Sequence, residues 1–214
     1  MKQRLLAFAA ISLLILAAAP AMQASFITFD AVARGWINSD GSPNGSYPTN
    51  NYIAGGHRSG LEYRNWFAFE PVFAGKAIAA ALVLDTVWFR SPQGTETYQI
   101  TSLGPSFSFS DLGTGTVYAT RVYSSSDYNR TVTIPLNAAA VADITSGQVF
   151  RVSGRMITLD SDPRNDEYAF GASQGSSHIA RLSVTTELPE PSTSLLVGFG
   201  LLGLSGLRRR HGRR

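Results

Sequence analysis

The central part of the chain alternates short β-rich runs with turn residues, and this pattern restricts the fold more than any other feature. Each run is rich in Val, Ile, Thr, Tyr or Phe, and segments such as 39–45 (SDGSPNG) and 162–165 (DPRN) separate many of them. Nine runs are expected as strands: 26–37, 62–69, 78–89, 97–103, 116–123, 131–136, 149–159, 167–172 and 178–186. Only 137–145 has a helical pattern, which ends before Gly147. The sequence therefore predicts an all-β fold, an antiparallel β-sandwich of jelly-roll type with one short helix.

Side-chain alternation within two runs indicates which faces are buried. In 62–69, Tyr63, Phe67 and Phe69 share one face, whereas Trp66 lies on the face that carries the charged residues. This run is expected to have one buried and one exposed face. Apolar residues occupy both faces of 78–89, which predicts a central strand that is covered on both sides.

The first 24 residues have the pattern of a secretory signal peptide. Lys2 and Arg4 form a basic start, 5–19 is apolar, and Ala19-Pro20-Ala21 fits an A-x-A cleavage site. Cleavage is expected after Ala21, with Ala24 as the second candidate. The Sec translocon and signal peptidase are the partners that this pattern predicts.

The last 26 residues have a different pattern, which predicts a brief attachment to a membrane. Pro189 and Pro191 fix φ and remove backbone donors, so no helix or strand is expected to run through them. The uncharged run 195–207 would span about 20 Å as a helix, which is shorter than the roughly 20 residues of a stable membrane span. A basic cluster follows this run, and the positive-inside rule predicts that it stays cytoplasmic. Its arginines are Arg208, Arg209, Arg210, Arg213 and Arg214.

The motif Pro189-Glu190-Pro191, the short apolar run and the arginine cluster resemble the PEP-CTERM sorting signal of bacterial proteins. In that family, a membrane-embedded exosortase recognises the tail and cleaves it near the motif, in Gram-negative bacteria that make exopolysaccharide. The resemblance implies an exported protein with an inner-membrane anchored intermediate, which is then placed on the cell surface or secreted. An ordinary C-terminal membrane anchor is the alternative. The expected organisation is signal peptide 1–24, ectodomain 25–188 and sorting signal 189–214.

The charge of the ectodomain differs from that of the whole chain. Without the two terminal signals, 11 basic and 14 acidic residues remain, a net charge of −3, whereas the whole chain carries +3. No basic patch supports nucleic-acid binding. The chain has no cysteine, which excludes disulfides and thiolate chemistry.

A second resemblance lies inside the ectodomain. The stretch 46–56 (SYPTNNYIAGG), the strand 62–70 (EYRNWFAFE) and the aliphatic run 78–84 are similar to the opening of DNRLRE-type sandwich modules of secreted bacterial proteins. This resemblance covers about a quarter of the chain. It implies an extracellular and often carbohydrate-associated setting, and it supplies no activity.

Two groups of residues are candidate binding sites. An acidic loop is the best candidate for Ca²⁺, because irregular loops can bring carboxylates and carbonyls together, although its spacing is not that of a calcium-loop motif and a solvated turn is the alternative. Its candidate ligands are Asp160, Asp162, Asp166 and Glu167. No other cofactor or metal is expected. Aromatic rings on turns or on an exposed strand face are candidates for sugar contact, with core or rim positions as the alternative. These rings belong to Tyr47, Tyr52, Trp66 and Tyr128.

These patterns predict a non-catalytic surface or matrix protein, structural or adhesive, that associates with exopolysaccharide. A lectin-like module is the alternative. A carbohydrate-active hydrolase or lyase is the third hypothesis, and it would require a carboxylate pair that the sequence does not single out. No catalytic residue is predicted.

Overall fold

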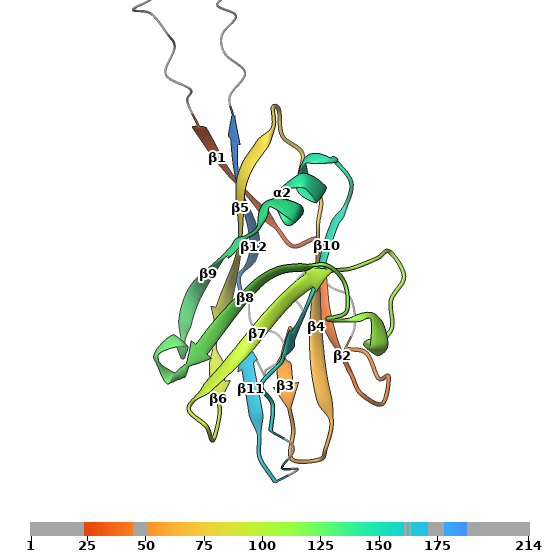
Figure 1. The fold of residues 1–214 in the computed structure, drawn as a ribbon, viewed down its shortest axis with the longest axis vertical. Helices are drawn as coiled ribbons and strands as arrows, with labels where there is room; N and C mark the ends of the chain where they lie inside the picture. The colour runs from red at the N-terminus through yellow and green to blue at the C-terminus, as the bar shows by residue number, and fades with distance from the viewer. Residues whose placement is uncertain (1–23, 45–50, 161, 163, 171–177, 188–214) are drawn as a thin grey trace, which may run out of the picture. The chain divides into compact units, whose positions relative to one another are not determined.

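Twelve strands, one α-helix and two 3-10 helices are described in a computed structural model of the chain (Figure 1). The structure describes residues 24–44, 51–160, 162, 164–170 and 178–187. The strands are β1 Ala24–Asp30, β2 Ala33–Asn38, β3 Ala54–Gly56, β4 Glu62–Phe69, β5 Ala77–Thr86, β6 Trp88–Arg90, β7 Thr95–Ser102, β8 Val117–Ser124, β9 Arg130–Leu136, β10 Phe150–Met156, β11 Glu167–Phe170 and β12 Ala180–Glu187. The helices are η1 Phe109–Asp111, η2 Ser125–Asp127 and α2 Ala138–Thr145.

The strands form two sheets whose order is that of a jelly roll. One sheet has the order β1-β12-β5-β9, and the other has the order β6-β11-β3-β4-β10-β7-β8, with β2 also paired to β4. The chain passes repeatedly from one sheet to the other, with β7 and β8 as consecutive paired strands of the larger sheet, and the pairs β5–β9, β4–β10 and β7–β10 run antiparallel. The all-β sandwich predicted from the sequence is confirmed.

The chain crosses between the sheets at two points inside runs that were each predicted as one strand. In 26–37, Ala31 N donates to Ala180 O in the first sheet, and Val32 N donates to Ala68 O in the second. The run therefore becomes β1 and β2. In the same way 78–89 divides at Val87 into β5 and β6, which belong to different sheets. Composition does not change at either crossing, so the sequence gives no signal of the division.

The main core lies between the sheets and contains a buried polar link. The Tyr98 hydroxyl on β7 donates to Asn65 Oδ1 on β4 at 2.6 Å, and Asn65 Nδ2 donates to the Tyr52 carbonyl at 2.7 Å. Gly154 on β10 makes room for this link, because a Cβ at that position would lie 1.8 Å from the Tyr98 hydroxyl. The apolar residues around the link include Phe67, Phe69, Leu82, Leu84, Ile100, Ile134, Phe170 and Leu182.

A second, smaller core covers the face of β4 that was expected to be exposed. Trp66 is only 6% exposed and packs on Phe107, with ring centroids 5.0 Å apart. Leu112 and Ile37 complete this cluster. The prediction for this face of β4 was wrong because the covering segment, which includes η1, comes from a part of the chain far from β4.

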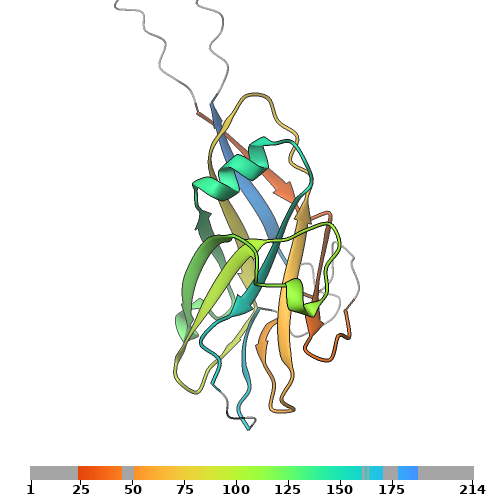
Figure 2. The ribbon, with the colours of Figure 1, turned by 45° about the vertical axis from the view of Figure 1, so that its right-hand side comes forward.

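The helix prediction is confirmed, and the sequence explains its start. The Asn137 side chain accepts hydrogen bonds from the backbone N–H groups of Ala139 and Ala140, which caps α2. Ala140 and Ile144 are its buried residues. The helix packs against β5 and β8, one strand from each sheet (Figure 2). It therefore covers the core between the two sheets at that position.

Residues Ser25–Thr186 form one compact unit, and the main core is built entirely from it. Ala24, the second candidate for signal-peptide cleavage, is the first residue of β1. Ala21, the motif Pro189-Glu190-Pro191, the apolar run 195–207 and the five tail arginines lie outside the described residues. In the part of the chain that is described, no helix is long and apolar enough to span a membrane.

Candidate functional site

Two exposed aromatic rings, one on the strand β6 and one in the connection between β8 and β9, meet on the surface. Trp88 on β6 is 43% exposed and Tyr128 is 48% exposed. Their ring centroids are 5.7 Å apart and their planes are inclined at 74°, which is an edge-to-face contact. We call these two rings the aromatic pair. Exposed rings in edge contact keep apolar faces available to a ligand.

Local structure fixes both members of the pair. β6 is at the edge of the larger sheet and pairs with β11, where Trp88 is opposite Phe170. Tyr128 is the C-cap of η2, whose start is capped because the Ser124 side chain accepts from Ser126 N. Asn129 then takes a left-handed conformation, with φ 54°, before β9 begins. The short helix and this turn therefore present Tyr128 beside the edge strand.

A polar pocket of about 370 Å³ is lined by residues that are next to the aromatic pair in the sequence. Its lining includes Val87 and Asn129, which are the direct chain neighbours of Trp88 and Tyr128. The other lining residues are Asp85, Thr86, Arg130, Thr131 and His178. Apolar ring faces beside several hydrogen-bonding groups are the combination that sugar-binding sites need.

The charged groups of this pocket are not equivalent. Asp85 is held in place, because its carboxylate accepts from the Thr131 hydroxyl at 2.6 Å and from Ile179 N at 2.8 Å. The pKa of His178 is lowered, first by burial and then by the positive charge of Arg34, which favours the neutral imidazole. Arg130 is exposed and is one of the residues that line the pocket.

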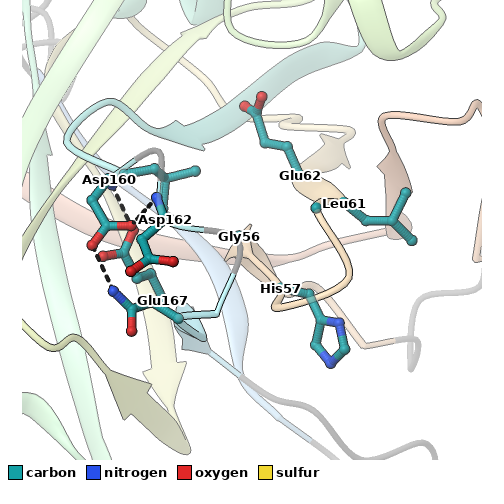
Figure 3. A pocket seen from close by; sticks show the side chains of 10 residues that line it. Gly56, His57, Leu61, Glu62, Asp160, Asp162 and Glu167 are labelled. Atoms are coloured by element: carbon teal, nitrogen blue, oxygen red, sulfur yellow. Dashed lines mark hydrogen bonds between the residues drawn. The ribbon is translucent and has the colours of Figure 1, made fainter.

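The acidic loop lines a second pocket, of about 240 Å³ (Figure 3). Asp160, Asp162 and Glu167 gather on one side of it, whereas His57 points away on the other side. Asp160 is engaged by protein donors: its carboxylate accepts from Gln93 Nε2 at 2.6 Å and from Asn165 Nδ2 at 2.8 Å. These bonds lower the pKa of Asp160, and the bond from Asn165 has the largest effect.

Asp166 does not join the other three acidic residues, which corrects the predicted ligand set. Its carboxylate accepts from Arg58 N at 3.1 Å and from Arg90 Nη1 at 3.2 Å, and it lies 3.7 Å from His57 Nε2. The backbone bond from Arg58, followed by the charges of His57 and Arg90, lowers the pKa of Asp166. Asp166 therefore serves as the partner of a cationic cluster.

The geometry gives the calcium hypothesis no support within the described residues, where no three acidic or histidine side chains converge as metal ligands. Glu167 is buried, and its Oε1 has no hydrogen-bond partner there, while Oε2 accepts from Asp160 N at 2.7 Å. Burial and the nearby charge of Glu96 raise the pKa of Glu167. Glu96 is itself buried on β7, where it alternates with the buried Tyr98 and Ile100. Calcium binding stays a prediction that calorimetry on the purified protein can test.

The residues predicted to contact sugar lie in different environments. Tyr52 is fully buried, and its hydroxyl donates to the Ile179 carbonyl at 2.6 Å, so it is a core residue. Trp66 belongs to the smaller core. Both predictions were wrong, because each ring is covered by segments distant in sequence. Tyr128 is exposed, and Tyr47 lies outside the described residues. Tyr128 contacts Trp88, a ring that was expected in the core or at its rim.

The comparison with protein families concerns the tail. Residues 187–210 match the PEP-CTERM protein-sorting motif. This match confirms the resemblance drawn from Pro189, Glu190 and Pro191, and it supports an exported protein whose membrane-anchoring sorting signal is processed by an exosortase. The search of the curated proteins finds no match for this chain. The function of the β-sandwich must therefore be argued from its own surface.

Proposed function

We propose that the exported β-sandwich is a non-catalytic module that binds polysaccharide in the matrix outside the cell. The aromatic pair beside the polar pocket carries this proposal. Trp88 and Tyr128 are exposed although most large apolar side chains of the sandwich are buried, and their contact holds both rings in place. A ring that is already ordered loses little conformational entropy when a sugar packs on it.

The polar pocket supplies the second requirement, which is orientation. Sugar hydroxyl groups both donate and accept hydrogen bonds. Asp85 offers carboxylate acceptors whose position is fixed by Thr131 and Ile179, and Asn129 and Arg130 add side-chain donors at the pocket wall. The chain neighbours of both rings line the pocket, and we propose that one sugar chain contacts the rings and the pocket together. This arrangement supports a saturable site within a structural or adhesive protein of an exopolysaccharide matrix.

The non-catalytic part of the proposal rests on the state of the carboxylates. Both oxygens of Asp85 accept protein hydrogen bonds, and Glu62 forms an ion pair with Arg64 at 2.7 Å. Hydrolysis of a glycosidic bond would require a carboxylic acid and a carboxylate that face each other across the substrate. We therefore favour binding over hydrolysis.

The remaining parts of the proposal concern the route and the setting. We propose export through the Sec translocon with removal of the signal peptide, a stay at the inner membrane of a Gram-negative cell, and transfer to the cell surface or release after exosortase processing. The sorting motif at 187–210 supports this route. The expected partner after export is exopolysaccharide.

Affinity electrophoresis tests the binding proposal. The protein of residues 25–187, which contains the whole compact unit, would migrate through native gels that contain alginate, polygalacturonate, dextran or hydroxyethylcellulose. At least one of these glycans should retard it, and Trp88→Ala or Tyr128→Ala should abolish the retardation. Phe26→Ala is the matched control, because Phe26 is 70% exposed on β1. Unchanged mobility with every glycan, or an equal effect of Phe26→Ala, would contradict the proposal.

A further inference from the structure

The charged residues next to the aromatic pair in the sequence differ in whether they form ion pairs. Asp127, which precedes Tyr128, accepts from Arg121 Nη2 at 2.8 Å. Arg90, which follows Trp88 on β6, pairs with Asp166 at 3.2 Å. Arg130 forms no ion pair with any residue that the structure describes. It is therefore the cation that remains available at this site.

The position of Arg130 is set by the sheet. It is the first residue of β9, its register partner on β5 is Thr86, and it follows Tyr128 by two residues. Arg130 lines the same pocket as Asp85. Burial lowers the pKa of the Arg34 guanidinium, and the nearby negative charge of Asp85 partly opposes this shift. Asp85 thus has the buried Arg34 near it, while the Arg130 side chain is exposed.

We propose that this site selects polysaccharides that carry carboxylate groups, such as uronic acid polymers, and that Arg130 determines the selectivity. The inference rests on the proposed function and adds the ligand class to it. A guanidinium donates two parallel hydrogen bonds to a carboxylate, which a neutral sugar does not reproduce. The aromatic pair contacts the apolar face of the sugar, and Arg130 contacts its acidic substituent.

Because of the net charge of the domain, a preference for carboxylate-bearing polysaccharides must come from local contacts. Residues 25–188 carry a net charge of −3, so the long-range field of the domain repels a polyanion. Preference for an acidic glycan must then come from a short-range contact. Arg130, beside the aromatic pair, provides this contact.

The test uses two glycans with one backbone: polygalacturonate and fully methyl-esterified polygalacturonate. Titration calorimetry should show about 2- to 5-fold tighter binding of the free acid by the native protein, because an exposed ion pair contributes a modest amount of affinity. Arg130→Gln should bind both polymers with the weaker affinity, and Arg130→Lys should keep part of the preference. The melting temperature of these variants should stay unchanged, which separates a ligand contact from a structural role.

The controls separate failure of this inference from failure of the proposed function. Arg58→Gln removes the same charge from an exposed position on the turn between β3 and β4 and should keep the preference. Trp88→Ala should weaken binding of both polymers. Equal binding of the acid and the ester by the native protein, or a preference that survives Arg130→Gln, would overturn the carboxylate selectivity and leave the polysaccharide site standing. Binding of neither polymer would overturn the inference outright, and the neutral glycans of the electrophoresis panel would then decide the proposed function.

Discussion

The rings of Trp88 and Tyr128 meet edge to face with centroids 5.7 Å apart, although one belongs to the edge strand β6 and the other to the end of η2. The contact joins the edge of the larger sheet to the connection between β8 and β9. The first residues of β9 line the polar pocket. Both rings stay exposed. The fold therefore holds an apolar surface in a fixed orientation beside hydrogen-bonding groups.

Conservative changes in the aromatic pair should separate the role of the ring from that of the hydroxyl. Tyr128→Phe should keep glycan binding within about 3-fold, because the ring face remains. Tyr128→Ala should weaken binding about 5- to 30-fold, as truncation of an aromatic contact at a binding surface commonly does. Calorimetry with polygalacturonate measures both values. If Tyr128→Phe weakened binding as much as Tyr128→Ala, the hydroxyl and not the ring would be the main contact.

Replacing Gly154 should destabilise the core. In Gly154→Ala, the new Cβ would meet the Tyr98 hydroxyl and also its Cζ, which lies 2.2 Å from the Cβ position. We expect a loss of about 1–3 kcal/mol in the free energy of unfolding, measured by urea denaturation. Tyr98→Phe should not relieve the clash, because Cζ remains. In a protein that carries Tyr98→Leu, Gly154→Ala should reduce the free energy of unfolding by a smaller amount. If the effects of the two substitutions were fully additive, the side chains at positions 98 and 154 would not be in contact, which would contradict this account.

Glu167 should make the protein less stable as the pH rises. Its pKa is raised by burial and by Glu96, so the stability it contributes is complete below the unfolded-state pKa of about 4.3 and is lost as the pH rises through its folded-state pKa. Glu167→Gln should therefore raise the melting temperature at pH 7–8 and leave it unchanged near pH 4. Glu70→Gln, at an exposed position after β4, is the control. A lower melting temperature of Glu167→Gln at pH 7 would contradict this account.

Asp166 should have the opposite pH dependence. Its pKa is lowered, so its contribution is present above the unfolded-state pKa of about 3.9 and is lost as the pH falls through the folded-state pKa. Asp166→Asn should reduce the melting temperature at pH 7 by about 2–4 °C, if the lost contacts amount to about 1 kcal/mol. The difference from the native protein should close in acid. Asp162→Asn, in a largely exposed ion pair with Arg164, should have little effect at any pH, and a similar loss there would refute a specific role of Asp166.

Local signals in the sequence were sufficient for most strands and for the helix, but no predicted run covers β3. β4 was predicted with its observed bounds, and Asn137 marks the start of α2, because both depend on residues that are neighbours in the chain. The crossings at Ala31 and Val87 were not predictable, since they depend on which sheet accepts the next backbone bond. The composition of the strands does not indicate to which sheet each part of the run belongs.

The same difference explains the candidate site. Trp66 and Trp88 both lie on strands, and the sequence placed Trp66 at the surface. Phe107 and Leu112 cover Trp66, whereas Trp88 is at a sheet edge with Tyr128 beside it. Burial of an aromatic ring thus depended on packing between distant segments, and side-chain alternation alone could not indicate it. Arg130 escaped attention for a related reason, since only the three-dimensional structure shows that it forms no ion pair with a described residue.

The tryptophan side chains allow the most direct test of the account. The protein has three tryptophans, so its NMR spectrum should contain three indole N–H signals, which single Trp→Phe variants would assign. Titration with oligogalacturonate should shift the Trp88 signal in a saturable way and leave the signals of Trp36 and Trp66 in place. A titration with acidic and neutral oligosaccharides that moves only Trp36 or Trp66, or none of the three, would contradict a polysaccharide site at the aromatic pair.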